Sequence, residues 1–126
     1  MKRLLIIHHS MTDGTRQMGQ AALEGAMGES NIAVAGMHAA ETSAEDLLES
    51  DGYIFATPEN LASMAGVMKD FFDRCYYPLL DQIQGRPYAT QTPEAIAAPK
   101  TISTADLARC HELGAAFAAG LTAGIF

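Results

Sequence analysis

Apolar residues in this chain gather in short unbroken runs, separated by longer segments in which they recur every three or four positions. Two of the runs, Arg3 to His8 and Tyr53 to Thr57, are rich in Leu, Ile and aromatic side chains. Unbroken apolar runs of this length indicate strands that are buried on both faces of a parallel sheet. Residues 31–37 predict a further strand at the edge of the sheet, and another strand is expected at 88–90.

The segments between these runs have the spacing of amphipathic helices. A helix is expected at 16–27, and a short acidic helix at 41–49 with Ser43 in its first turn. A longer helix is expected from Met64 onward; its apolar stripe is Met64, Val67, Met68, Phe71, Phe72 and Cys75. A last helix is capped by Ser103 or Thr104. Its apolar face is Leu107, Cys110, Leu113 or Gly114, Phe117 and Leu121.

This alternation of strands and helices implies an α/β fold, in which a doubly wound, mostly parallel sheet lies between two layers of helices. With 126 residues, the whole chain (1–126) is expected to form one domain. Ligands of such sheets bind beyond the carboxyl ends of the strands. The turns after the runs at 3–8 and 53–57 are therefore the first places to look for a site.

The turn after the first strand carries hydroxyl groups directly before a predicted helix. Free backbone N–H groups and a partial positive charge make a helix N-terminus a natural phosphate site, and a glycine lets the backbone approach the anion. The candidate phosphate-binding residues are Ser10, Thr12, Asp13, Gly14 and Thr15. The alternative is that Ser, Thr and Asp act here only as turn formers and helix caps.

The turn after the run at 53–57 begins with Pro58, which removes a backbone donor and ends the strand. Residues 59–63 are expected to form a polar loop before the helix that starts at Met64. An ordinary connection from strand to helix would have the same outline, and the helical stripe by itself indicates only packing. The candidate binding residues in this loop are Pro58, Glu59, Asn60, Leu61, Ala62, Ser63 and Met64.

Three blocks follow one another in this part of the chain: Thr57-Pro58-Glu59-Asn60, Ser63-Met64-Ala65-Gly66, and then Lys69, Phe72, Asp73 and Arg74. Their order resembles the flavodoxin-like NAD(P)H-dependent FMN reductases, in particular the tryptophan-repressor-binding-protein-type quinone reductases. In that family the loop wraps the isoalloxazine ring of FMN, and its backbone amides reach the pyrimidine edge. The resemblance implies the flavodoxin-like strand order 2-1-3-4-5, which brings the loops after strands one and three together.

The first turn resembles the phosphate loop of flavodoxins, with one departure. Asp13 occupies the position of the family's glycine, and Gly14 follows one place later. A carboxylate beside a phosphate dianion would repel it unless the side chain points away or caps the helix.

A second departure follows Thr90, where the predicted strand stops and residues 91–94 have the composition of a turn. In the family, this strand continues into a glycine-rich loop beside the flavin, then a helix and a last strand. Either the chain has a natural deletion here, or the residues of a mobile stretch are absent from the sequence. The second explanation is favoured, because the deletion would expose a large apolar face of the sheet.

Composition excludes several classes of function. The net charge of −7 opposes binding to nucleic acids and to anionic membranes. No apolar run approaches the ~20 residues of a membrane-spanning helix, and the amino terminus lacks the apolar core of a signal peptide. Cys75 and Cys110 are expected to be reduced core residues of a cytoplasmic protein. His8 and His9 are expected to be strand-end residues, because no further metal ligands accompany them.

The resemblance implies FMN as the cofactor, NAD(P)H as the co-substrate and a quinone-like small molecule as the electron acceptor. No residue of the chain is assigned a catalytic proton transfer. The alternatives are an electron-transfer flavodoxin, or a flavin-free module for binding or assembly that shares the architecture. The family suggests a homo-oligomer, and the final apolar pair, Ile125 and Phe126, indicates docking or a subunit contact.

Overall fold

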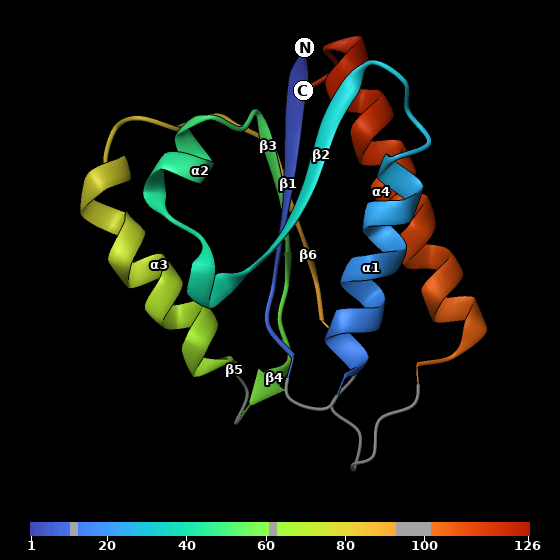
Figure 1. Cartoon of the computed structure of the whole chain (residues 1–126), viewed down its shortest axis with the longest axis horizontal. Coiled ribbons are helices and arrows are strands. Elements are labelled where there is room, and N and C mark those ends of the chain that lie inside the picture. The colour runs from blue at the N-terminus through green and yellow to red at the C-terminus, as the bar shows by residue number, and fades with distance from the viewer. Residues whose placement is uncertain (11–12, 61–62, 93–101) are drawn as a thin grey trace.

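The computed structural model describes residues 1–10, 13–60, 63–92 and 102–126 (Figure 1). Its elements in chain order are β1 (Lys2–His8), α1 (Gly14–Ala26), β2 (Ile32–His38), the 3-10 helix η1 (Ala39–Glu41), α2 (Ala44–Leu48), β3 (Gly52–Ala56), β4 (Glu59–Asn60), β5 (Ser63–Met64), α3 (Gly66–Leu79), β6 (Tyr88–Gln91) and α4 (Thr104–Ala123). The strands and helices alternate as the apolar pattern predicts.

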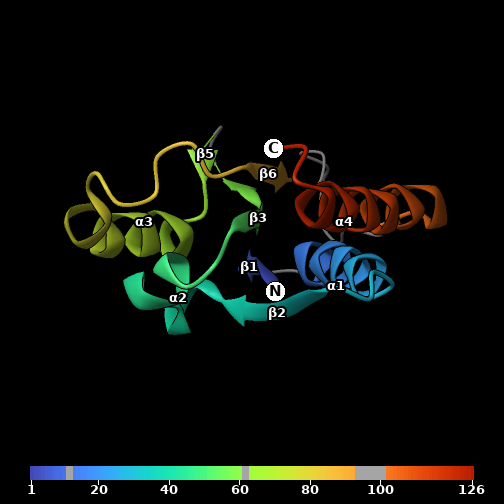
Figure 2. The ribbon, with the colours of Figure 1, turned by 90° about the horizontal axis from the view of Figure 1, so that it is seen from above.

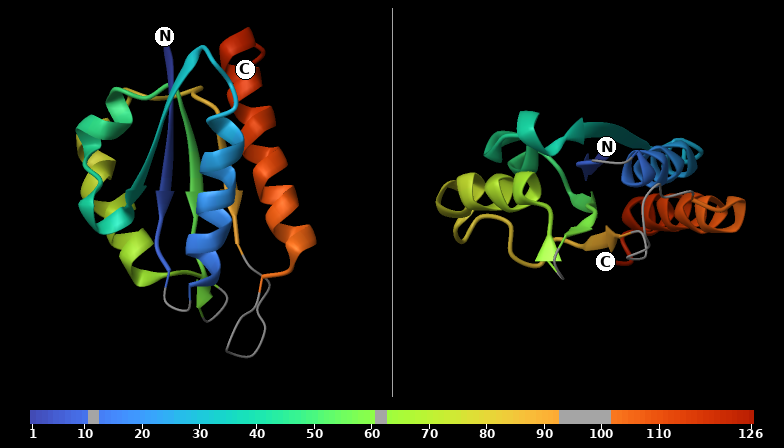
Figure 3. Two further views of the ribbon diagram at one scale, coloured as in Figure 1. Left: turned by 45° about the vertical axis from the view of Figure 1, so that its right-hand side comes forward. Right: turned by 90° about the horizontal axis from the view of Figure 1, so that it is seen from below.

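The main sheet has four parallel strands in the order β2-β1-β3-β6. This is the predicted order 2-1-3-4, with β2 at the expected edge. A fifth strand is not found in the described ranges, and residues 92–103 alone connect β6 with α4. Helices α1 and α4 cover one face of the sheet, while α2 and α3 cover the other (Figures 1–3). The fold is flavodoxin-like and doubly wound.

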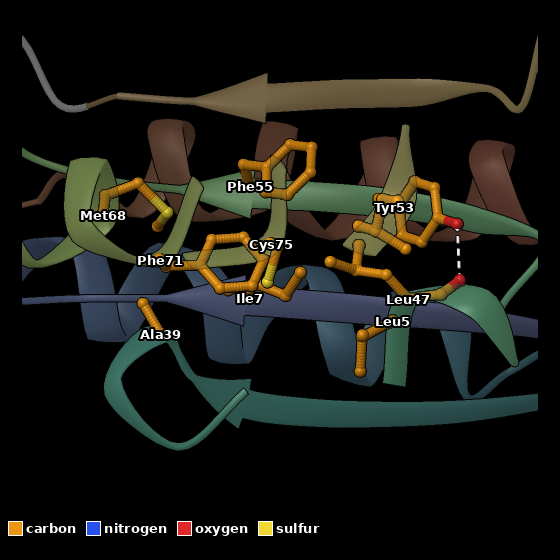
Figure 4. Packing of buried hydrophobic residues seen from close by; sticks show 10 residues of the cluster. Leu5, Ile7, Ala39, Leu47, Tyr53, Phe55, Met68, Phe71 and Cys75 are labelled. Carbon is orange, nitrogen blue, oxygen red and sulfur yellow. Dashed lines mark hydrogen bonds between the residues drawn. The ribbon is translucent and has the colours of Figure 1, made fainter. Parts of the chain in front are cut away.

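The two faces of the sheet have separate cores, because alternate residues of a strand point in opposite directions. Odd-numbered residues of β1, Leu5 and Ile7, pack with Tyr53 and Phe55 under α3 (Figure 4). Even-numbered residues pack under α1 and α4, where the cluster includes Leu4, Ile6, Ile54, Phe117 and Leu121. Both central strands are therefore buried on both faces, as their unbroken apolar sequences indicate.

The helix ends follow local chemistry. Ser43 caps α2 in a capping box with Asp46, so it lies just before the first turn rather than within it. Ser103 caps α4 by accepting a hydrogen bond from Asp106 N–H (3.1 Å). The expected start of α3 at Met64 is wrong: Ser63 and Met64 pair with β4 as β5, so the helix begins at Gly66.

Helices α1 and α4 approach each other closely at two glycines. A Cβ atom added to Gly25 would lie 2.0 Å from the carbonyl oxygen of His111, and one added to Gly114 would lie 1.9 Å from that of Ala22. No side chain fits at either place. The choice between Leu113 and Gly114 on the apolar face of α4 is thereby settled in favour of Gly114, which is buried.

Arg86 joins the carboxyl end of α2 to the sheet. Its Nη1 donates to the carbonyl oxygens of Leu47 (3.0 Å), Leu48 (2.9 Å) and Ser50 (2.7 Å), and lies 3.2 Å from the hydroxyl of Tyr53. These carbonyls close a five-residue helix that has no basic residue in its last turn. The guanidinium therefore neutralises the negative end of α2 from a distant part of the chain.

We expect Arg86→Ala to lower the free energy of unfolding by about 2 kcal/mol, because hydrogen bonds from a charged donor to partly buried carbonyls are lost. Urea denaturation measures this difference. Arg109→Ala is the matched control: Arg109 forms an exposed pair with Asp106 one turn away, so its loss should have little effect. Equal destabilisation by both substitutions would contradict the assigned role of Arg86.

Candidate functional site

The carboxyl ends of β1 and β3 meet at one edge of the sheet, as neighbouring parallel strands require. His9 N–H, just after β1, donates to the carbonyl oxygen of Ala56, the last residue of β3 (3.1 Å). The turn that leads to α1 and the β4–β5 hairpin leave the sheet at this same edge (Figure 1). The two loops with candidate binding residues are therefore neighbours.

The candidate phosphate turn is the segment 10–15, called the phosphate turn below, and Ser10 is its first residue. Its Oγ is buried and has no hydrogen-bond partner in the described part of the structure. A buried hydroxyl without a partner is unfavourable by about 1–3 kcal/mol, so an orphaned group of this kind calls for an explanation. A phosphate oxygen at this edge would satisfy it.

Gly14 and Thr15 are the first residues of α1, and both are buried. Their backbone N–H groups belong to the first turn, where an α-helix has no internal acceptors. N–H groups of this kind are the donors that an anion bound at a helix N-terminus would use. Thr12 lies outside the described residues.

Asp13 has the backbone conformation of a glycine. Its φ of 69° lies in the left-handed region, which asparagine and aspartate tolerate better than other residues with a side chain. This explains how Asp13 can stand at a glycine position. Its side chain does not cap α1; it bonds to the guanidinium of Arg16, with Oδ2 3.1 Å from Nη2, and to Gln17.

The charge of Asp13 is partly compensated by this pairing. The hydrogen bond from Arg16 lowers the pKa of the Asp13 carboxyl, so the group is ionised at neutral pH. The side chain is more than half exposed, and its bonds run along the outside of α1. A carboxylate at this position avoids repelling a phosphate if it caps the helix or points away. The Asp13 side chain does not cap α1; it forms an ion pair with Arg16 instead.

The second loop is a hairpin rather than an irregular loop. Glu59 pairs with Met64 and Asn60 with Ser63. Thr57 fastens the base of the hairpin: its Oγ1 accepts from Ala65 N–H (3.2 Å) and donates to the Pro58 carbonyl oxygen (3.1 Å). These two bonds join the beginning of the hairpin, at Thr57 and Pro58, to its end at Ala65.

The candidate residues of the hairpin differ in exposure. Pro58 is buried, while Ser63 and Met64 are exposed to solvent. Leu61 and Ala62 lie outside the described residues. The structure therefore brings Ser10, Asp13, Gly14 and Thr15 to the same edge as Pro58, Glu59, Asn60, Ser63 and Met64.

Three histidines lie together at the carboxyl ends of β1 and β2. The rings of His8 and His9 both meet the ring of His38 edge-on, with centroids 5.6 and 5.3 Å away, and His9 Nδ1 lies 3.3 Å from His38 Nε2. Ala40 N–H donates to His38 Nδ1 (3.1 Å), so in the neutral ring the proton is on Nε2 and is donated to His9. The sequence places His8 and His9 together at the end of a strand, but it does not indicate that His38 lies beside them. His38 reaches them because the register of β1 and β2 pairs it with His8.

Burial lowers the pKa of His8 and of His9, and the positive charge of protonated His38 lowers both further. His9 and Arg16 lower the pKa of His8 further, while Glu41 raises it. The lowered pKa values of His8 and His9 favour their neutral forms at neutral pH.

In the described ranges, no group of three or more His, Cys, Asp or Glu residues is placed to hold a metal ion.

We expect the apo-protein to lose stability as the pH falls below about 6.5, the ordinary pKa of histidine. The folded-state pKa of His8 and His9 is lowered, so the unfolded chain binds more protons in this window, and its free energy falls relative to the folded state. Urea denaturation at pH 5.5 and 7.5 measures the difference. His38→Gln should reduce it, whereas the same change at the exposed His111 should not.

Gln91 is a polar residue that the sequence pattern assigned to a turn. It is instead the last residue of β6, where its side chain is 5% exposed, and its carbonyl oxygen accepts from Thr57 N–H (3.1 Å). Both its Oε1 and its Nε2 are without partners in the described part of the structure. No periodic signal in four residues could have indicated this burial.

A large apolar groove of about 710 Å³ lies between α3 and β6. Among the described residues, its lining includes Thr57, just before the hairpin, and Met64 within it, but no residue of the phosphate turn. Its walls are aromatic and aliphatic side chains, including Phe55, Phe72 and Tyr88. The groove is therefore a separate feature from the phosphate turn.

Comparison with known proteins identifies the relatives of this chain. A family model described as NADPH-dependent FMN reductase matches residues 13–108. A protein named NAD(P)H dehydrogenase (quinone) from Acidithiobacillus ferrooxidans is 34% identical over 94 residues, which cover 59% of this chain and 47% of that protein. A protein named flavodoxin from Aquifex aeolicus is 31% identical over 86 residues, covering 68% and 46%. The chain thus spans about half the length of the curated relatives it matches.

Solved structures share the fold. The flavodoxin, WrbA-like protein from Agrobacterium tumefaciens superposes with a TM-score of 0.73 at 19% identity, over 94% of this chain and 96% of that one. At this identity the likeness concerns the fold alone. Of the helices that the structure describes, none combines the length and the hydropathy needed to cross a bilayer.

Proposed function

This chain belongs to the NADPH-dependent FMN reductase family, and from that premise we propose that it is an oxidoreductase that binds FMN at the carboxyl edge of its sheet. The family match over residues 13–108 carries the proposal, because it includes Asp13, Gly14 and Thr15 of the phosphate turn and the whole hairpin. The orphaned hydroxyl of Ser10 supports it independently, since a phosphate oxygen is the acceptor that this group lacks.

In this proposal, the FMN phosphate accepts hydrogen bonds from the hydroxyl groups of Ser10, Thr12 and Thr15. It also accepts from the backbone N–H groups of Gly14 and Thr15 at the start of α1. Residues 58–64 hold the ring, and the backbone N–H groups of residues 59–63 stabilise negative charge on its pyrimidine side. Bound FMN supplies the two-electron chemistry that joins a reduced nicotinamide to an acceptor. The protein orients these partners, and no side chain is assigned a proton transfer.

We propose NAD(P)H as the electron donor and a quinone-like molecule as the acceptor. The acceptor rests on the name of the Acidithiobacillus ferrooxidans relative, of which this chain covers 47%. The match to a protein named flavodoxin favours a second candidate, electron transfer without a nicotinamide. The third candidate function is a flavin-free binding module. The ionised Asp13 favours it, because a carboxylate beside the phosphate would repel FMN.

The deciding experiment is a visible absorption spectrum, recorded after adding FMN to the purified protein and removing unbound flavin. Retained flavin bands would support the proposal; a folded protein that retains none at saturating FMN would overturn it. NADH and NADPH are then added aerobically, with and without a quinone. Oxidation that depends on the quinone supports a reductase, and retained flavin without nicotinamide oxidation supports a flavodoxin.

We expect Asp13→Asn to strengthen FMN binding about fivefold at low ionic strength, because one negative charge beside the phosphate is removed (~1 kcal/mol). Asp13→Gly should do the same and also raise the free energy of unfolding by about 1 kcal/mol, since glycine adopts a φ of 69° without strain. Fluorescence titration of FMN measures both affinities. Asp106→Asn is the control, because Asp106 lies in the first turn of α4 and pairs with its own Arg109. Weaker binding by Asp13→Asn would show that the Arg16 pair helps to form the site.

A further inference from the structure

The outer edge of β6 is unpaired in the part of the chain that the structure describes. Of the described strands, β3 alone pairs with β6: Tyr53 N–H donates to the Pro87 carbonyl and Thr57 N–H to the Gln91 carbonyl, both at 3.1 Å. Successive residues of a strand turn their backbone groups to opposite edges. The N–H and C=O groups of Tyr88 and Thr90 therefore face away from β3, and none of the described strands bonds to them.

Exposed apolar side chains lie along this edge. Tyr88 is 68% exposed, and together with Tyr76 (59%) and Leu80 (49%) it borders the groove between α3 and β6. On the other face of the sheet, the C-terminus lies beside the start of β6, and Ile125 and Phe126 are exposed there (Figures 2 and 3). An unpaired strand flanked by apolar residues is the usual site for pairing with another chain.

The edge is also nearly free of charge. Residues 85–92 include one charged side chain, that of Arg86, and its guanidinium is bound to the carbonyls at the end of α2. The chain as a whole carries −7, so two copies repel each other over most of their surface. Residues 85–92 contain no carboxylate, so this segment of the edge adds no negative charge to that repulsion.

We propose that the edge of β6 binds the same edge of a second copy of this chain. An antiparallel pair of β6 strands around a twofold axis places Tyr88 of one copy opposite Thr90 of the other, so that the outward N–H and C=O groups of both residues bond across the interface. The side chains of Tyr88 and Thr90 both line the groove. The two grooves therefore meet, and each copy covers apolar surface of the other.

A second copy fits this surface better than a small molecule. A ligand in the groove would cover the aromatic walls but would leave the backbone groups of the edge exposed to solvent. A second sheet edge satisfies those groups and covers the apolar side chains on both faces. The interface makes no use of the phosphate turn, so the proposal holds or fails independently of FMN binding.

The test is the mass of the protein in solution, measured by sedimentation velocity from about 1 to 100 μM. We expect a dimer of about twice the 13.4 kDa chain mass at the upper end. Thr90→Pro removes an outward N–H that the ladder with β3 does not use, and Tyr88→Lys puts like charges into the interface. Each should weaken dimerisation at least tenfold. Met27→Lys is the control, because Met27 is as exposed (65%) but lies at the end of α1.

Amide hydrogen exchange gives a second readout. The N–H groups of Tyr88 and Thr90 should be protected at 100 μM and exchange freely after dilution. A wild-type monomer at 100 μM would overturn the proposal, as would a dimer that both variants retain at wild-type strength. Circular dichroism confirms that each variant is folded; if Thr90→Pro is not, Tyr88→Lys and the exchange of the wild type decide the question.

Discussion

Ser10→Ala is expected to weaken FMN binding by about 10- to 100-fold, while the apo-protein keeps its stability or gains some. The loss follows from removing a hydroxyl donor to a charged phosphate oxygen, an interaction of about 1.5–3 kcal/mol. The gain follows from the burial of Ser10 Oγ without a partner, because a methyl group at that place needs none. Fluorescence titration of FMN and urea denaturation of the apo-protein measure the two effects.

The opposite signs of these effects separate a binding role from a structural one. If the Ser10 hydroxyl only supported the fold, the substitution would lower the stability of the apo-protein. Ser30→Ala provides the matched control, since Ser30 is exposed in the turn after α1 and should change neither quantity. Unchanged FMN affinity in Ser10→Ala would remove this residue from the phosphate site.

Gly114→Ala is expected to lower the free energy of unfolding by about 3 kcal/mol. The added Cβ would lie 1.9 Å from the Ala22 carbonyl oxygen and 2.7 Å from its carbonyl carbon. Because these are backbone atoms, no side chain can turn aside, and α1 and α4 must move apart along a well-packed interface. Thermal and urea denaturation measure the loss.

Gly66→Ala tests whether this cost comes from the close approach rather than from replacing a glycine. A Cβ at Gly66, the first residue of α3, meets nothing within 4 Å. We therefore expect it to leave stability unchanged or to raise it by about 0.5–1 kcal/mol. If Gly114→Ala proved as harmless as Gly66→Ala, the packing of α1 on α4 would differ from the structure.

The apolar pattern was sufficient to predict the sheet, because β1 and β3 are buried on both faces and β2 lies at the edge. It was insufficient for the β4–β5 hairpin, since strands of two residues have no measurable periodicity. Both free cysteines are buried, as predicted from their places on helix faces. The groove beside β6 is lined in part by Thr90, the residue at which the pattern of the family is interrupted.

The order of the strands was implied by the family resemblance. By itself, the sequence pattern determined the alternation of elements and the two turns in which binding chemistry is expected. These features depend on local properties: apolar spacing, helix caps, and the conformations that Pro and Gly impose. Only the tertiary structure decided that Ser10 Oγ is buried without a partner, that His38 joins His8 and His9, that Gln91 is buried, and that Gly114 touches Ala22. Each of these depends on the register and approach of elements distant in the chain, which no short window of residues specifies.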